Sequence, residues 1–195
     1  MEEEVTTVVG VSGKIGHGKD EVAKVLVERG FVVVRFSDEL KREVLQRLRR
    51  TLKEVVLAED PRVPVDAGEG WWDARLAHEL WNRKPPIIRK LLQEFGTEVR
   101  RADDPDYWCK KWYQVVAASS DPVVTPDVRF ENEARYVKMF NGRLVRVVRP
   151  GCDSTDTHPS ETLLDGWKSW DAVIVNDGTL KDLRAKVLSF LEAWS

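Results

Sequence analysis

Short apolar runs alternate with longer amphipathic segments along most of the chain. Five runs rich in valine predict buried strands, at residues 5–11, 31–36, 122–127, 143–149 and 172–175. Between and after them, apolar residues recur at helical spacing, in residues 21–28, 38–57, 71–81, 86–101, 104–118, 129–140 and 179–194. Strands that alternate with helices predict an α/β fold, with a mostly parallel five-stranded sheet flanked by helices.

A glycine-rich loop joins the first predicted strand to the first predicted helix. It reads Gly13-Lys14-Ile15-Gly16-His17-Gly18-Lys19-Asp20. Strand, glycine loop and helix form the context in which the pattern G-x-x-x-x-G-K-[ST] binds nucleotide phosphates. The glycines let successive backbone N–H groups point at an anion, and the helix start adds its partial positive charge. Lys19 can reach the outer phosphates, so the sequence predicts a P-loop site for a nucleoside triphosphate.

This loop departs from the pattern at its last position. Asp20 stands where Ser or Thr usually holds a magnesium ion. A carboxylate is a good ligand for a hard cation, so Asp20 can keep that role. An aspartate near a helix start can instead satisfy free N–H groups of the helix. Both interpretations stay open.

Composition narrows the class of protein. The 195 residues suffice for one compact domain, residues 1–195. Although 33% of the residues are charged, the formal net charge is −2, so no global basic field attracts nucleic acid. Cys109 and Cys152 lack metal-type spacing and indicate a reducing compartment. The acidic N-terminus differs from a secretion signal and no apolar run reaches membrane-spanning length, so we expect a cytoplasmic protein.

Polar residues after the predicted strands are candidate ligand contacts, because open parallel sheets bind ligands at the carboxyl ends of their strands. Asp38 can orient or deprotonate an acceptor or help hold Mg²⁺ through water, or it can be a helix-start aspartate. Lys41, one turn later, can bind an acceptor phosphate or face solvent. Asp127 ends the third strand, where P-loop proteins often place a magnesium-associated carboxylate.

Two further residues follow that third strand. Arg129 can bind the acceptor or the transferring phosphate, and Glu133 can fix Arg129 or recognise the sugar or base. With Asp127 they can also form a salt-bridged helix start. Lys14, inside the loop, can contact the transferring phosphate or be a solvated lysine.

The helical block at residues 71–120 lies between the second and third strands, where a P-loop fold would receive a second substrate. Arginine binds phosphate oxygens in a bidentate manner, although a generic surface arginine is commoner. Trp108 can stack on a base or pack in a core. The candidate substrate contacts of this block are Arg89, Gln93, Arg101 and Trp108.

The polar connection at residues 150–166 is a candidate lid, of the kind that kinases close to exclude water. Arg149 can touch the triphosphate, and His158 and Glu161 are candidate substrate contacts from the lid. Asn176 and Gly178 follow the last strand and can border the adenine of ATP, or form a turn and helix cap.

Several segments, in order along the chain, resemble the deoxynucleoside monophosphate kinase family best known from bacteriophages. The resemblance implies an adenylate-kinase-like P-loop fold, with ATP as the phosphoryl donor and a deoxynucleoside monophosphate as the acceptor. The family often has Thr after the loop aspartate, where this chain has Glu21, which leaves the metal or phosphate contact there open. The segments are residues 13–20, 36–41, 91–98, 104–108, 127–134, 158–161 and 176–180.

We therefore predict a single-domain P-loop kinase, monomeric or homodimeric, that uses ATP and Mg²⁺. Lys19, Asp20, Asp38 and Arg129 are the predicted catalytic residues, and Asp20 and Asp127 the candidate metal ligands. A P-loop kinase for a hydroxymethylated pyrimidine in DNA, or one resembling dephospho-coenzyme A kinase, is the competing enzyme. A nucleotide-binding switch or ATPase is the alternative from another class.

Overall fold

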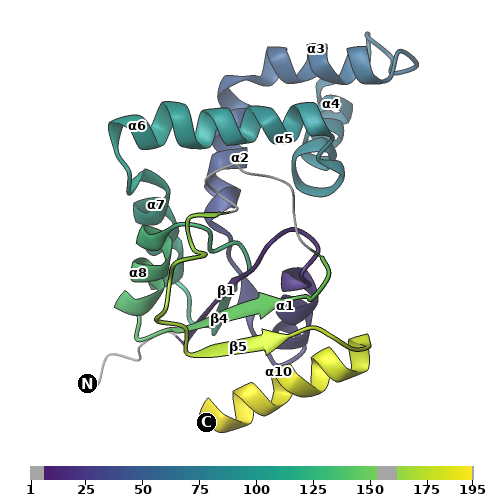
Figure 1. Ribbon diagram of the computed structural model, residues 1–195. Coiled ribbons are helices and arrows are strands. Elements are labelled where there is room, and N and C mark those ends of the chain that lie inside the picture. The colour runs from purple at the N-terminus through teal and green to yellow at the C-terminus, as the bar shows by residue number, and fades with distance from the viewer. Residues whose placement is uncertain (1–6, 153–161, 195) are drawn as a thin grey trace. The chain divides into compact units, whose positions relative to one another are not determined.

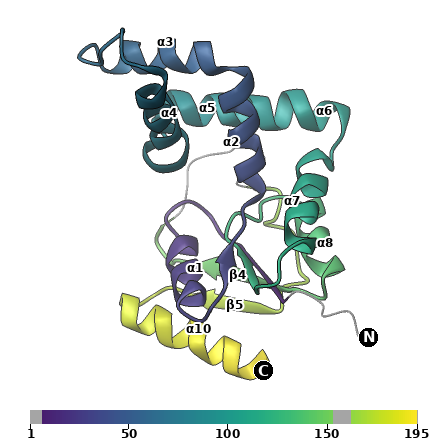
Figure 2. The same ribbon diagram turned by 180° about the vertical axis from the view of Figure 1, so that it is seen from behind.

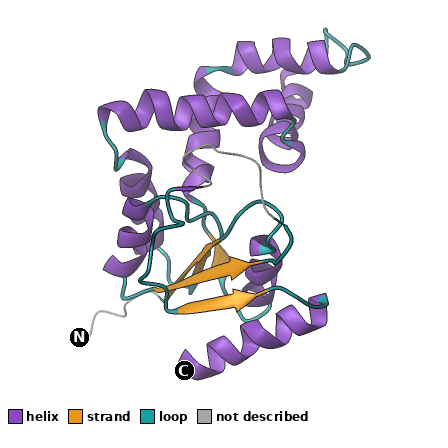
Figure 3. Ribbon diagram, in the orientation of Figure 1, coloured by secondary structure: helices purple, strands orange, loops and turns teal. Residues whose placement is uncertain are grey.

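The computed structural model describes residues 7–152 and 162–194, and the chain divides into two compact units (Figure 1). The first unit consists of Met1–Phe36 with Cys109–Ser195, and the second is Ser37–Trp108. The sequence predicts a helical insert at residues 71–120, whereas the second unit begins directly after Phe36. The first unit contains the sheet and the second is helical (Figure 3).

The sheet of the first unit has five strands in the order β2-β3-β1-β4-β5, and all neighbouring strands are parallel. This confirms the predicted α/β fold with a parallel sheet. The strands are β1 (Val8–Ser12), β2 (Val32–Val33), β3 (Val123–Thr125), β4 (Arg143–Val148) and β5 (Ala172–Val175).

Helices cover both faces of this sheet (Figure 2). On one face, Leu26 and Leu183 pack with Val9 and Val145. On the other face, Trp112 packs in a second cluster with Val8, Val123 and Leu144 of the strands. Two-sided burial explains why β1 and β3, in which every residue is buried, are almost entirely apolar. The covering helices are α1 (Lys19–Val27) and α10 (Leu180–Trp194) on the first face, and α7 (Tyr107–Ala117) and α8 (Glu131–Met139) on the second.

The helical unit has its own core, built around Trp72, Leu76, Leu80 and Leu52. Its elements are α2 (Phe36–Arg47), α3 (Arg49–Glu59), α4 (Glu69–His78), the π-helix η1 (Glu79–Arg83), α5 (Pro86–Gln93), the π-helix η2 (Glu94–Arg100) and α6 (Arg101–Asp103). None of the helices within residues 7–152 and 162–194 is long and apolar enough to cross a membrane.

Four elements differ from the sequence prediction. The helix predicted at residues 38–57 is two helices, because Leu48 leaves the helical region with φ −112° and ψ 21°. The helices predicted at 71–81 and 86–101 both end in π-helices, which apolar spacing does not reveal. The strand predicted at 31–36 is assigned only at Val32–Val33, since α2 already begins at Phe36.

Candidate active site

The glycine loop follows β1 and wraps back toward β4. Gly16 and Gly18 have φ values of +81° and +101°, which L side chains rarely adopt. A Cβ at Gly13 would lie 2.5 Å from the carbonyl oxygen of Val147, so that position has no room for a side chain. The loop therefore needs its glycines both for its backbone conformation and for its close approach to β4.

The side chain of Lys19 folds back onto the start of the loop. Its ammonium donates to the carbonyl oxygens of Gly13 at 2.6 Å and Lys14 at 2.8 Å. Burial, together with the positive charge of Arg129, lowers the pKa of Lys19 to about 8 against the opposing effect of Asp20. A half-buried ammonium at the end of a glycine loop is suited to an incoming polyphosphate.

His17 and Asn176 hold the loop in place. The two ring nitrogens of the buried His17 lie 3.0 Å from the carbonyl oxygens of Val147 and of Cys152. The side-chain amide of Asn176 donates to the carbonyl oxygen of His17 at 3.0 Å. The sequence places Asn176 near adenine; its amide is directed at the loop, and its contact with a nucleotide stays a prediction.

Lys14 is paired with a carboxylate from the chain that follows β4. Its ammonium lies 3.3 Å from Asp165, and Arg146 donates to the same carboxylate at 2.6 Å. Although burial opposes it, hydrogen bonding from Arg146 and Lys14 holds the pKa of Asp165 below its usual value. Arg146 lies beside Ser12 in the register of β1 and β4, next to the start of the loop. Sequence reasoning missed Arg146, because strand register is not readable from the sequence, and Asp165, because it lies in a turn that the chain brings to the loop only on folding.

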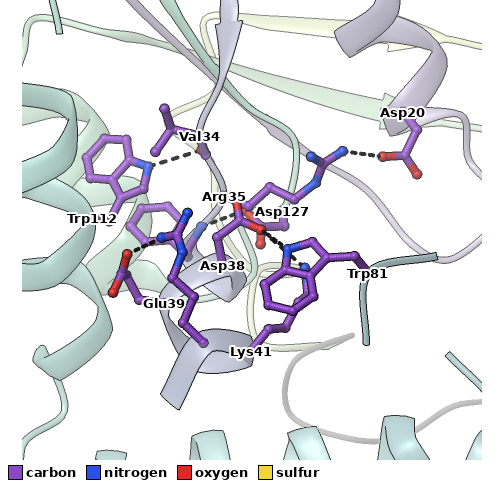
Figure 4. Close-up of polar contacts among 11 residues, drawn as sticks. Asp20, Val34, Arg35, Asp38, Glu39, Lys41, Trp81, Trp112 and Asp127 are labelled. Carbon is purple, nitrogen blue, oxygen red and sulfur yellow. Dashed lines mark hydrogen bonds and ion pairs between the residues drawn. The ribbon is translucent and has the colours of Figure 1, made fainter. Parts of the chain in front are cut away.

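The two candidate metal ligands belong to the same unit and have different partners (Figure 4). Arg35 donates to Asp20 at 3.2 Å, and the side chain of Asp20 remains largely exposed. Asp127 accepts a hydrogen bond from the backbone N–H of Phe36 at 3.0 Å. Within residues 7–152 and 162–194, no group of three or more His, Cys, Asp or Glu side chains is arranged to hold a metal ion.

Glu133 is buried and holds the turn that carries Arg129. Its carboxylate accepts the backbone N–H groups of Arg129 at 2.7 Å and of Phe130 at 3.1 Å. These bonds favour the first of its two predicted roles, fixing Arg129. Since Arg129 also lowers the pKa of Lys19, its charge acts on the loop lysine.

Asp38 and Lys41 form an ion pair one helical turn apart in α2. The Lys41 ammonium donates to Asp38 Oδ1 at 3.3 Å, and Lys41 is only 3% exposed, so it is not the solvated helix lysine of the simpler interpretation. The indole N–H of Trp81 donates to the same oxygen at 3.2 Å (Figure 4). No local pattern in the sequence indicates Trp81, which lies far along the chain in the π-helix η1.

The other candidate substrate contacts of the helical unit differ in burial and in hydrogen-bond partners. Trp108 is buried and donates to the Gly96 carbonyl at 3.0 Å, so its indole packs inside the unit. Arg101 donates to the carbonyl oxygen of Pro105 at 3.3 Å. Arg89 is exposed and Gln93 half-buried. Their contacts with substrate stay predictions.

The remaining candidates lie after β4. Arg149 is exposed. At Gly178 a Cβ would lie 2.7 Å from Asp182, whose carboxylate accepts the backbone N–H of Thr179 at 2.8 Å, as in a turn with a helix cap. His158, Glu161 and most of the candidate lid lie outside the described residues.

A parallel sheet with a glycine loop and a lysine after its central strand defines a P-loop nucleotide-binding fold. In agreement, a solved dephospho-CoA kinase from Campylobacter jejuni has the same fold, with a TM-score of 0.50, 16% identity and coverage of 98% of each chain. The model of the deoxynucleotide monophosphate kinase family matches residues 71–187. The chain belongs to this family.

Individual relatives agree with this assignment. A putative deoxynucleotide monophosphate kinase of Acanthamoeba polyphaga mimivirus is 31% identical over 94% of this chain and 95% of its own length. The deoxynucleotide monophosphate kinase of Enterobacteria phage T4 is 32% identical over 54% of this chain and 45% of its own length. The resemblance stated from the sequence is thereby confirmed, and family membership implies a nucleotide substrate.

Proposed function

We propose that this protein transfers the γ-phosphoryl group of ATP to the phosphate of a deoxynucleoside monophosphate and releases ADP and a deoxynucleoside diphosphate. The observation that carries the proposal is the Lys19 ammonium, held by the carbonyl oxygens of Gly13 and Lys14 at the end of a glycine loop in a chain of this family. A polyphosphate that displaces those carbonyls offers the ammonium full negative charges.

Phosphoryl transfer needs alignment and charge stabilisation more than covalent help from the protein. Lys19 and the N–H groups of the loop bind the donor phosphates, and Arg129 adds a guanidinium for the transferring group. Asp38 accepts a hydrogen bond from Lys41 and orients the acceptor, while Lys41 supplies positive charge for the acceptor phosphate.

The donor set also fits a magnesium ion. Asp20 and Asp127 supply hard carboxylate oxygens near Lys19, whose pKa both of them influence. When bound, Mg²⁺ neutralises charge on the phosphates. Because it prefers one or two carboxylates together with phosphate and water oxygens, two carboxylates suffice.

The proposal is tested by measuring ADP release from Mg-ATP with single acceptors. These are the deoxynucleoside monophosphates, the ribonucleoside monophosphates, dephospho-CoA and a hydroxymethyluracil-containing DNA. We expect turnover with at least one deoxynucleoside monophosphate, lost in Lys19→Ala. Lys24→Ala is the matched control, since Lys24 lies on the same helix and its ammonium pairs with Glu21 at the surface.

The other outcomes of this assay would assign the protein a different acceptor or a different activity. Turnover only with DNA or only with dephospho-CoA would move the acceptor to that class. ADP release that no acceptor stimulates would leave a P-loop ATPase or switch and end the kinase proposal.

A further inference from the structure

Trp81 lies in a π-helix whose first residue is a buried carboxylate. Glu79 is 1% exposed, forms an ion pair with Arg75 at 2.9 Å, and accepts a hydrogen bond from Arg83 at 3.3 Å. These arginines lie one turn before and one turn after Glu79. Their contacts therefore stabilise the junction at which α4 ends and the wider π-helix η1 begins. Widened turns of this kind occur frequently at functional sites.

The indole of Trp81 contacts both members of the Asp38–Lys41 pair. Its N–H donates to Asp38 Oδ1 at 3.2 Å, and the Lys41 ammonium lies 5.6 Å from its ring centroid (Figure 4). The same oxygen of Asp38 accepts from Lys41 at 3.3 Å. One rigid aromatic group thus contacts a carboxylate and an ammonium that are one turn apart on α2.

The two contacts differ in what they fix. A neutral N–H donor sets the direction of a carboxylate without cancelling its charge, whereas a second cation would cancel it. The face of the ring attracts the ammonium through the quadrupole of the indole, which favours Lys41 staying beside Asp38 while buried. Packing alone would require neither the direction of the N–H nor the ring above the ammonium.

We propose that Trp81 is a positioning residue of the phosphoryl acceptor side, which fixes the rotamer of Asp38 and keeps the Lys41 ammonium next to it. This inference rests on the proposed function, since it assigns Trp81 a role through two residues of that site. Glu79, through Arg75 and Arg83, supports Trp81 by holding the π-helix.

Steady-state kinetics of two variants test the proposal. Trp81→Phe keeps an aromatic face but removes the N–H, so we expect kcat to fall about tenfold, the effect of a lost hydrogen bond to a charged group, with KM for Mg-ATP within about twofold of wild type. Trp81→Leu removes the face as well, so we expect KM for the monophosphate to rise in addition. Trp71→Phe is the matched control, because Trp71 lies on α4 of the same unit and is 40% exposed.

A double-mutant cycle separates positioning from general packing. In a protein that already carries Asp38→Asn, Trp81→Phe should change kcat by less than about twofold, because the oriented carboxylate is already gone. Equal kcat values for Trp81→Phe and Trp71→Phe would overturn the proposal. A full loss of about tenfold that persists in the presence of Asp38→Asn would overturn it as well.

The indole N–H resonance of Trp81 gives a readout that needs no active variant. We expect it to shift in Asp38→Asn and on addition of the monophosphate to wild type, and a resonance unchanged in both would overturn the proposal. Failure of the proposed function is distinguishable, because it would appear as wild-type protein without acceptor-dependent ADP release.

Discussion

The ammonium of Lys14, inside the phosphate-binding loop, lies 3.3 Å from the carboxylate of Asp165, which belongs to the chain after β4. Arg146 binds the same carboxylate at 2.6 Å. Asp165 therefore pairs with two cations beside a loop built to receive phosphates. It competes with the phosphates of a nucleotide for the positive charge of Lys14 and Arg146.

Removal of this competing anion should strengthen nucleotide binding. We expect Asp165→Asn to lower the Kd for ATP about threefold at low salt, in keeping with the small worth of a partly exposed ion pair, and the gain should shrink at high salt. Titration calorimetry at two salt concentrations measures it. Asp121→Asn, which removes an exposed carboxylate elsewhere in the same unit, is the control. Weaker binding in Asp165→Asn would show that the carboxylate aids the nucleotide.

The lowered pKa of Lys19 predicts a pH dependence of nucleotide binding. Above a pH of about 8 the free protein carries a neutral Lys19, so binding must take up a proton, and the Kd for ATP should rise up to about tenfold per pH unit. Calorimetry in two buffers of different ionisation enthalpy measures the uptake. In Lys19→Met the proton uptake above pH 8 should disappear; its persistence would assign it to another group.

The free energy of unfolding of the nucleotide-free protein should depend on the same proton. It should increase with pH, whereas ATP binding should weaken with pH. The pKa of Lys19 is about 8 in the folded protein and near 10.5 in the unfolded chain, so the unfolded chain binds more protons between these values. The contribution of Lys19 to the free energy of unfolding therefore increases from pH 8 to 10.5. Urea titrations give the free energy of unfolding at each pH. Plotted against pH, the values for wild type and Lys19→Met should diverge across that window and run parallel below a pH of about 7.

Glu133 should matter more for stability than its neighbours on α8. We expect Glu133→Ala to lower the free energy of unfolding by about 2 kcal/mol, because two backbone N–H groups lose their acceptor in a buried turn. Both N–H groups donate to the same oxygen, so Glu133→Gln keeps their acceptor but loses its charge and should lose about half as much. Urea unfolding measures both, with Glu131→Ala as the control on an exposed residue of the same helix. A loss as small as that of the control would mean that the hydrogen bonds of Glu133 do not stabilise the turn.

Asn176 should couple the last strand to the loop. Asn176→Ala removes the amide donor to the His17 carbonyl, and we expect a loss of about 1 kcal/mol in unfolding free energy together with weaker ATP binding. Asn82→Ala, at an exposed position of the helical unit, is the control. Stability that falls while ATP affinity stays at the wild-type value would limit Asn176 to a structural role.

The sequence by itself determined the α/β class, the phosphate loop and the family. These depend on local signals: valine-rich runs between helical segments, and eight consecutive residues that form the loop. Apolar spacing also located most helices, but it could not distinguish α- from π-helical turns at Glu79–Arg83 and Glu94–Arg100, because both place apolar side chains toward a core.

Only the tertiary structure decided which distant side chains share a charge or a hydrogen bond. Strand register sets Arg146 beside Ser12, and chain folding brings Asp165 to Lys14 and Trp81 to Asp38. The buried Glu133 accepts backbone N–H groups of the turn that carries Arg129, a contact that residue type alone does not reveal. Such pairings mostly join residues far apart in the chain, and their energies depend on burial and direction, which no local pattern of residue types contains.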